Sequence, residues 1–245
     1  MEWQPVVHDF VVIDTETTGT DPEKDAVVEI ALVGILNRCI RSEWVSRVKP
    51  PVAIPPQASG IHHLTDADVR SAPSLADLAP SLLEKIGSSV LVAHNAAFDR
   101  SFLPMLSDRP WVCSWRLARH VWPEIEHHGN QALRYWLGID TECPREQRLA
   151  HSALDDARIT AKVFLQAARR STETENVRSM KDLIELADRP ILLKTIPFGK
   201  HKGQEFRNLP ADYVAWLKKN AEDPDVRYTL SHLGGARISN LGGLK

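Results

Sequence analysis

The sequence has few cysteines and no long apolar run. Its 245 residues include three cysteines, Cys39, Cys113 and Cys143, and none of them forms a CxxC pair. This sparse, odd set argues against a disulfide framework or a structural zinc site and is typical of a reducing cytoplasm. No stretch reaches the roughly 18 apolar residues of a membrane-spanning helix, so we expect no membrane partner. The N-terminus also lacks the pattern of a signal peptide, and we therefore expect a cytoplasmic protein.

The chain carries little net charge, but its charges are unevenly distributed. The formal net charge is −2. Residues 191–245 hold nine basic and five acidic side chains, a formal charge of +4, which leaves −6 for residues 1–190. An acidic part followed by a basic tail is compatible with a metal site that acts on a polyanion.

The apolar pattern predicts an α/β fold. Apolar runs predict strands at 10–14, 27–36, 42–48, 89–95 and, as a short candidate, 112–115, of which the first three form an antiparallel meander. Helical spacing predicts helices at 74–86, 96–107, 117–122 and about 151–170. Three strands followed by alternating strands and helices indicate a mixed β-sheet flanked by helices.

The sequence also predicts a division into parts. We expect a domain over 1–170, a linker over 171–190 that begins with the polar stretch STETENVRS, and a small basic C-terminal module over 191–245. A segment of this size is rarely very stable alone, so we expect the module to pack on the main domain or on a partner.

Two carboxylates, Asp14 and Glu16, follow the first apolar run. Residues two apart on a strand point to the same side, where two carboxylates repel each other and favour a bound cation. Taken alone, the pair is explained equally well as two solvated side chains at the end of a strand. Asp99, in the first turn of a predicted helix, is by itself an ordinary helix cap. His151 alone is more often a surface or core histidine than a catalyst.

The complete set is more specific than its parts. Asp14, Glu16, Asp99 and Asp156 provide oxygen ligands from three separate segments. Such ligands suit Mg²⁺ or Mn²⁺, and two such ions can clamp the attacking and leaving oxygens of a phosphodiester. A neutral His151 is suited to accept a proton from an attacking water.

Three motifs carry a family resemblance. DTETTG (14–19), HNAAFD (94–99) and His151-x4-Asp156 resemble the exonuclease motifs of the DEDD superfamily, in the branch with a catalytic histidine (DEDDh) and an RNase H-like fold. Four residues separate His151 from Asp156, so Asp155 is a neighbour of the motif acid. ASGIHHLTD resembles the family's IHGIT loop, with His63 where glycine is usual. SWRLARHVWPEI and the tail FGKHKGQ resemble bacterial exonuclease X.

The resemblance implies an activity and a role for each acid. The implied enzyme is a 3′→5′ exonuclease that releases nucleoside 5′-monophosphates from DNA, with an expected place in DNA repair. Asp14 would bridge two ions, Glu16 and Asp156 would help hold the ion that activates water, and Asp99 would support the second ion. His151 would be the general base.

Substrate contacts are also implied. The backbone at Thr15, Thr17, Thr18 and Gly19 would meet the terminal nucleotide, Ile61 and Phe98 would pack on the last base, and His62 would hold the 3′ end. Core packing is the alternative for Ile61 and Phe98. In the tail, Lys200, His201, Lys202 and Arg207 would contact phosphates. Alternatively, Tyr213 and Trp216 bury against the main domain while the lysines stay solvated.

The predicted partners are DNA 3′ ends, single-stranded or duplex, and no motif indicates a protein partner. Two alternatives share the motifs and stay open: a polymerase-associated proofreading exonuclease and an RNA-trimming exoribonuclease. The second stays open because only the 2′-hydroxyl separates RNA from DNA in such sites. A non-catalytic nucleic-acid-binding protein on a nuclease fold is disfavoured because all four acids and the histidine are present.

Overall fold

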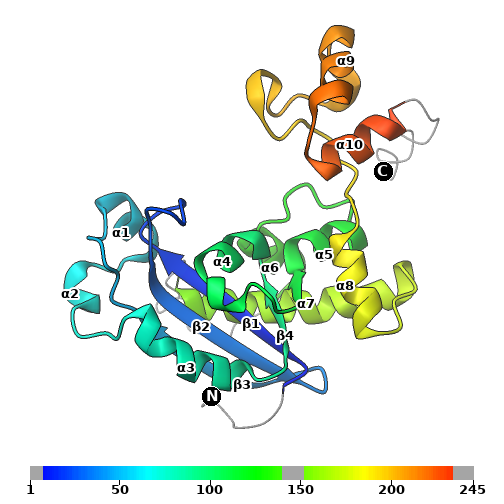
Figure 1. Ribbon diagram of the computed structural model, residues 1–245. Coiled ribbons are helices and arrows are strands. Elements are labelled where there is room, and N and C mark those ends of the chain that lie inside the picture. Colours follow the sequence, from blue (N-terminus) through cyan, green and yellow to red (C-terminus); the bar gives the residue numbers. More distant parts are fainter. Residues whose placement is uncertain (1–7, 140–151, 234–245) are drawn as a thin grey trace. The chain divides into compact units, whose positions relative to one another are not determined.

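The computed structural model describes residues 8–139 and 152–233 (Figure 1). The chain divides into two units, Met1–Asp188 and Arg189–Lys245, and each is described by itself. Among the described helices, none combines the length and the apolar character that crossing a membrane requires.

A five-stranded sheet forms the centre of the first unit, in the order β3-β2-β1-β4-β5. The strands are β1 (Phe10–Thr17), β2 (Val27–Leu36), β3 (Cys39–Arg47), β4 (Val90–Ala93) and β5 (Trp111–Cys113). β1, β2 and β3 are antiparallel, whereas β4 runs parallel to β1 and β5 runs parallel to β4. The prediction of a mixed sheet is therefore confirmed.

Helices cover both faces of this sheet. They are α1 (Pro56–His62), α2 (Asp66–Val69), α3 (Leu75–Ile86), α4 (Ala96–Phe102), η1 (Pro104–Leu106), α5 (Ser114–Val121), α6 (Asn130–Trp136), α7 (Ala153–Thr174) and α8 (Met180–Asp188). Figure 1 shows α3 and α7 on opposite sides of the sheet.

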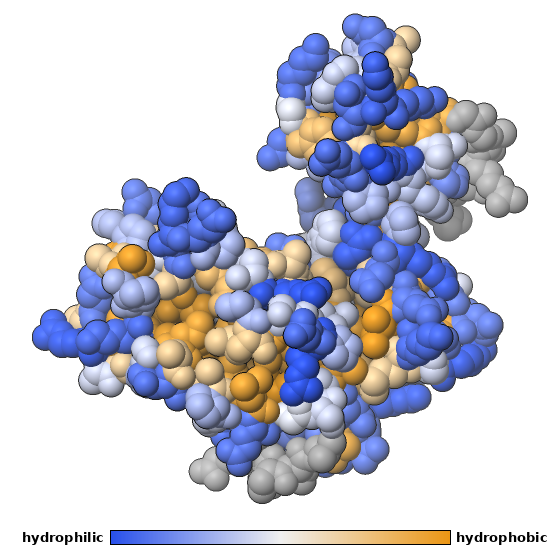
Figure 2. Space-filling view, viewed as in Figure 1, coloured by the Kyte–Doolittle hydropathy of each residue, from blue (hydrophilic) through white to orange (hydrophobic). Residues whose placement is uncertain are grey.

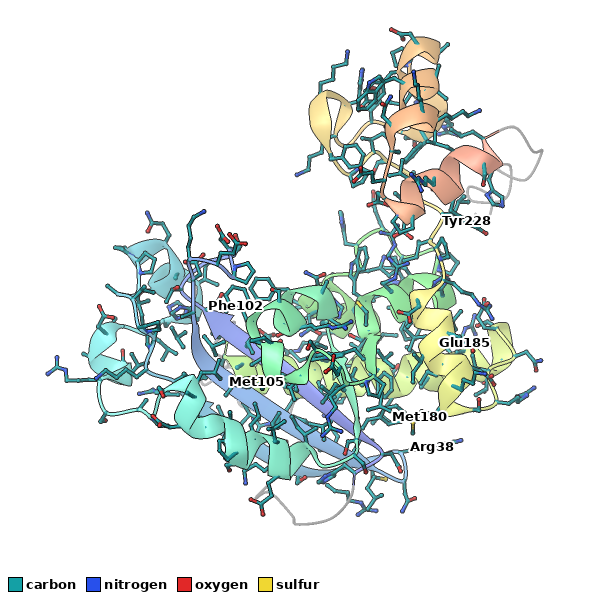
Figure 3. All side chains as sticks on the ribbon, viewed as in Figure 1. Arg38, Phe102, Met105, Met180, Glu185 and Tyr228 are labelled. Carbon is teal, nitrogen blue, oxygen red and sulfur yellow. The ribbon has the colours of Figure 1, made fainter. Side chains whose placement is uncertain are left out.

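Alternation along β1 assigns its side chains to the two faces. Val11 and Ile13 pack against α3 and α4, in a cluster that Phe102 and Met105 complete (Figure 3). Val12 packs on the other face with α5, α6, α7 and α8. Because successive side chains alternate, Asp14 and Glu16 share the face of Val12, which α7 covers.

The segment predicted as a linker, 171–190, is largely helical. α7 continues to Thr174, and α8 begins at Met180 (Figure 3). Leu183 and Leu186 of α8 are buried in the same core as α7. The polar stretch STETENVRS suggested a linker, but apolar residues at helical spacing after it have a core to pack on.

The second unit has a hydrophobic core of its own. It contains η3 (Gly199–His201), η4 (Phe206–Asn208), α9 (Ala211–Asn220) and α10 (Pro224–His232). Its buried residues are Ile196, Phe206, Leu217, Ala221, Val226 and Leu230. Backbone N–H groups of Ile191 and Leu193 donate to Asp225 and Thr229 at 2.8 and 2.9 Å, which joins the entering chain to α10.

The packing of α8 predicts where the first unit can be truncated without loss of stability. A chain ending at Asp188 keeps Leu183 and Leu186 buried, whereas a chain ending at Arg170 loses them. Full burial of a leucine contributes about 1.5–3 kcal/mol, so the shorter chain should lose several kcal/mol of unfolding free energy. Urea unfolding of the two chains measures this, and equal stabilities would contradict the packing of α8.

Candidate active site

Three carboxylates converge at the end of β1. Asp14 and Glu16 point toward α7, and Asp156 lies in the first turn of that helix. One ligand oxygen from each residue lies within 4.8 Å of the other two. The N-terminal turn of a helix favours negative charge, which helps to place Asp156 there. The structure thus brings Asp156 close to two acids that precede it by more than 130 residues in the sequence.

Asp99 reaches the site from α4. It is 3% exposed, and its Oδ1 accepts hydrogen bonds from the N–H of Thr15 at 3.1 Å and from its hydroxyl at 2.8 Å. β1 pairs with β4 only over Phe10–Val12, so the edge of β1 beyond Val12 is open to α4. Thr15 therefore positions Asp99, and its N–H is engaged within the protein.

Burial and mutual repulsion raise the pKa values of the acids in this cluster. Burial, followed by the charges of Asp99, Asp156, Glu16 and Glu29, raises the pKa of Asp14 well above its usual range. Burial and the neighbouring carboxylates raise the pKa of Glu16 to about 8. Burial raises the pKa of Asp99 to about 7, against the hydrogen bonds from Thr15. A cluster of partly buried like charges is costly unless a cation neutralises it, so these residues fit a divalent metal.

Further polar residues support the cluster and were not identified from the sequence. Gln131 Nε2 donates to Asp156 Oδ1 at 2.8 Å, and Asn130 Nδ2 donates to the Asp156 carbonyl at 3.1 Å. Glu29, opposite Glu16 in the sheet, accepts the N–H of Ala153 at 3.0 Å. Glu29 could have been noticed in the sequence as a single acid inside the apolar run VVEIALV. No sequence pattern points to Asn130 or Gln131.

Asp155 has a different environment from Asp156. Its carboxylate pairs with Arg158 at 2.9 Å, and Arg158 also binds Glu43 of β3 at 2.8 Å. This ion-pair network fastens α7 to the sheet. The structure therefore places Asp156 at the acid cluster and Asp155 outside it, in agreement with the spacing of the motif.

The turn after β1 is held by its own side chains. The Thr17 hydroxyl donates to the Gly19 carbonyl at 2.6 Å, and the Thr18 hydroxyl donates to Asp25 at 3.1 Å. The Thr18 N–H donates to the Ala26 carbonyl at 2.9 Å. A Cβ on Gly19 would collide with the Asp25 carboxylate, so glycine at this position leaves room for the carboxylate that accepts the Thr18 hydroxyl. These groups shape the turn beside the acids.

The other predicted substrate contacts differ in exposure. Ile61 on α1 is 52% exposed, whereas His62 is buried and its Nδ1 accepts the Leu64 N–H at 3.1 Å. Phe98 packs partly into the core, with its ring centroid 5.0 Å from that of Phe102. His63 has a φ of 63°, a left-handed conformation that explains why glycine is usual at this position.

Neither the predicted general base nor the predicted tail contacts belong to the described residues of the first unit. His151 lies outside the described residues, one position before Ser152. Lys200, His201, Lys202 and Arg207 belong to the second unit. Arg207 Nε pairs with Glu205 at 2.6 Å.

A family model described as Exonuclease matches residues 11–164. The chain belongs to this exonuclease family. It is 34% identical over 226 residues to Exodeoxyribonuclease 10 of Escherichia coli K12, a match that covers 90% of this chain and 96% of the relative. A second family model, described as a quorum-sensing-regulated virulence factor, matches residues 181–225.

Solved structures agree with this assignment. Exonuclease X in complex with 5′ overhanging duplex DNA has a TM-score of 0.61 and 33% identity, over 73% of this chain and 99% of that chain. E. coli exonuclease I in complex with a dT13 oligonucleotide shares the fold, with a TM-score of 0.57 and 17% identity over 68% of this chain and 42% of that chain. The predicted RNase H-like exonuclease fold and the resemblance to exonuclease X are confirmed.

The perturbed acids predict how stability depends on pH without metal. Glu16 has its pKa raised from 4.5 to about 8, so the folded protein holds this proton more tightly than the unfolded chain does. Its contribution is fully present below about pH 4.5 and is lost as the pH rises through about 8. Urea unfolding in EDTA should show falling stability over this range, with a smaller fall in Glu16→Gln. Equal pH dependence in both proteins would contradict the raised pKa of Glu16.

The hydrogen bond from Gln131 predicts a loss of metal affinity when it is removed. Gln131→Leu leaves Asp156 without this donor, and loss of such a partner typically costs about 10- to 100-fold in metal affinity or activity. The Mg²⁺ concentration for half-maximal cleavage should rise accordingly. Gln166→Leu, on the exposed side of α7, is the matched control and should change little. An unchanged Mg²⁺ requirement in Gln131→Leu would remove Gln131 from the site.

Proposed function

We propose that the protein is a metal-dependent 3′→5′ exodeoxyribonuclease that hydrolyses DNA ends to nucleoside 5′-monophosphates, in the cytoplasm and in DNA repair. The observation that carries this proposal is the convergence of Asp14, Glu16 and Asp156 within 4.8 Å at the end of β1. The near full-length similarity to Exodeoxyribonuclease 10 supports DNA as the substrate.

The acid cluster fits divalent cations of the hard kind, Mg²⁺ or Mn²⁺, because its donors are carboxylate oxygens. Asp14, Glu16 and Asp156 would hold one ion, and Asp14 with Asp99 would hold the second. When bound, such ions supply positive charge for the phosphate oxygens and lower the pKa of a coordinated water.

The protein's own residues supply orientation and proton transfer. His151 accepts the proton of the attacking water as general base, a role that rests on the family motif. Thr15 holds Asp99, and Gln131 holds Asp156, so that both carboxylates keep fixed positions. The turn at Thr17–Gly19 follows the acids directly along the chain, and we infer that it contacts the terminal nucleotide.

A proofreading-type exonuclease is the second candidate. The DNA polymerase III subunit epsilon of Treponema pallidum is 32% identical over 66% of this chain and 79% of that protein. The match to Exodeoxyribonuclease 10 extends over 90% of the chain, including part of the second unit, and favours the first candidate. The retained acid cluster disfavours a non-catalytic binding protein.

End-labelled substrates test the activity. A 5′-labelled single-stranded DNA should shorten from its 3′ end in Mg²⁺ and stay intact in EDTA, whereas a 3′-labelled strand should release labelled mononucleotide at once. Duplex DNA and RNA of the same sequence are the comparison substrates. Degradation of RNA alone, or removal of nucleotides from the 5′ end, would contradict the proposal.

Two variants test the assigned roles. His151→Ala should lower the cleavage rate by about 10²- to 10⁴-fold, the usual contribution of a general base. Asp14→Asn should abolish Mg²⁺-dependent cleavage. Circular dichroism of both proteins checks that they stay folded. Full Mg²⁺-dependent cleavage by either folded variant would overturn the assignment of that residue.

A further inference from the structure

Two neighbouring aromatic rings lie on α9: Tyr213 is half-buried and packs against the core of the second unit, whereas Trp216 is exposed. Tyr213 and Trp216 stack with their centroids 5.7 Å apart and an interplanar angle of 13°. Trp216 is 52% exposed and is not among the residues that form the core of this unit. Positions three apart share one side of a helix, so Lys219 continues the line of Tyr213 and Trp216 along α9.

The segment around η3 borders the same rings. Lys200 Nζ lies 5.6 Å from the centroid of the Tyr213 ring, and the His201 ring lies 4.3 Å from it. A Cβ on Gly199 would lie 3.4 Å from the Tyr213 hydroxyl, and Gly199 has a φ of 69°. Glycine therefore allows this segment to approach Tyr213 closely in a left-handed turn. The rings of Tyr213 and Trp216 and the side chain of Lys200 therefore form one continuous surface.

The charges around this surface are mainly positive. Lys200, Lys202 and Lys219 are exposed, and none of them pairs with a carboxylate in the described part of the unit. Glu205, in contrast, is engaged by Arg207 at 2.6 Å and by Lys194 at 4.0 Å. Figure 2 shows hydrophilic residues around an apolar band on the visible face of this unit. Arg207, whose charge is compensated, is not part of the surface.

We propose that Tyr213, Trp216, Lys200 and Lys219 form a binding surface for single-stranded nucleic acid in the second unit, apart from the acid cluster. This inference takes its ligand from the proposed function, which supplies a DNA strand. The exposed ring of Trp216, backed by Tyr213, is available to stack on an unpaired base of any sequence, and adjacent lysines meet the phosphates. Bases in a duplex are already stacked on each other, so the surface selects single strands. Sequence tolerance suits an enzyme that removes every nucleotide in turn.

Binding of the full chain to labelled oligo-dT in EDTA tests this surface. Fluorescence anisotropy compares a long single strand of about 30 nucleotides with a duplex of the same length, whose bases are already stacked on each other. Trp216→Ala should raise the Kd for the long strand by about 5- to 150-fold, the range for one lost stacked base. Trp216→Phe should keep most of the affinity, and the duplex should bind all three proteins alike.

Matched variants separate stacking and charge from general effects. Tyr228→Ala removes another exposed aromatic ring of the same unit, on α10 (Figure 3), and should leave the Kd unchanged. Lys200→Ala should lower the dependence of log K on log salt by about 0.7, the value for one phosphate contact on a single strand. Lys181→Ala, an exposed lysine of α8, is the charge control and should leave that slope unchanged.

The outcomes distinguish this surface from the proposed activity. If Trp216→Ala binds the long strand as tightly as the wild type at every salt concentration, the surface is refuted, whether or not the protein degrades DNA. If the wild type binds the long strand through Trp216 but never shortens it in Mg²⁺, the proposed activity is refuted and the surface stands. Loss of affinity in Tyr228→Ala equal to that in Trp216→Ala would also overturn the surface.

Discussion

Repulsion among partly buried carboxylates is the constraint on which the structure of this site depends. Asp14, Glu16 and Asp156 come within 4.8 Å of one another, and Asp99 and Glu29 add to the negative field. The fold tolerates this arrangement because hydrogen bonds from Thr15 and Gln131 hold two of the acids in place. The same repulsion is the source of affinity for divalent cations, so a cost to stability becomes the means of binding metal.

The topology explains why the acids meet where they do. The side chains of β1 alternate between two covered faces, so Asp14 and Glu16 face α7 while Thr15 holds Asp99 of α4. β1 and β4 are parallel, Asp14 and Glu16 lie in the C-terminal half of β1, and Asp99 follows β4, so the acids gather at the edge where sites occur in α/β sheets. The ion pairs of Arg158 with Asp155 and Glu43 then fasten α7 to the sheet beside the cluster.

Sequence patterns predicted those features that depend on local periodicity. The apolar runs located the strands, the period of two placed Asp14 and Glu16 on one face, and counting separated Asp156 from Asp155. The support from Gln131 depends on a contact across 25 residues and had no local signal. The segment 171–190 was predicted as a linker because its first half is polar, but whether α8 packs is decided by a core formed elsewhere in the chain.

Thermal unfolding during a Mg²⁺ or Mn²⁺ titration tests most directly whether metal relieves the repulsion of the acids. The wild-type midpoint should rise with metal concentration, because an ion that binds only the folded state stabilises it. Asp14→Asn has no carboxyl group to ionise at this position, so it should unfold at a higher temperature than the wild type in EDTA and should respond far less to metal. The account would be contradicted if neither ion changed the wild-type midpoint and if Asp14→Asn were no more stable than the wild type in EDTA.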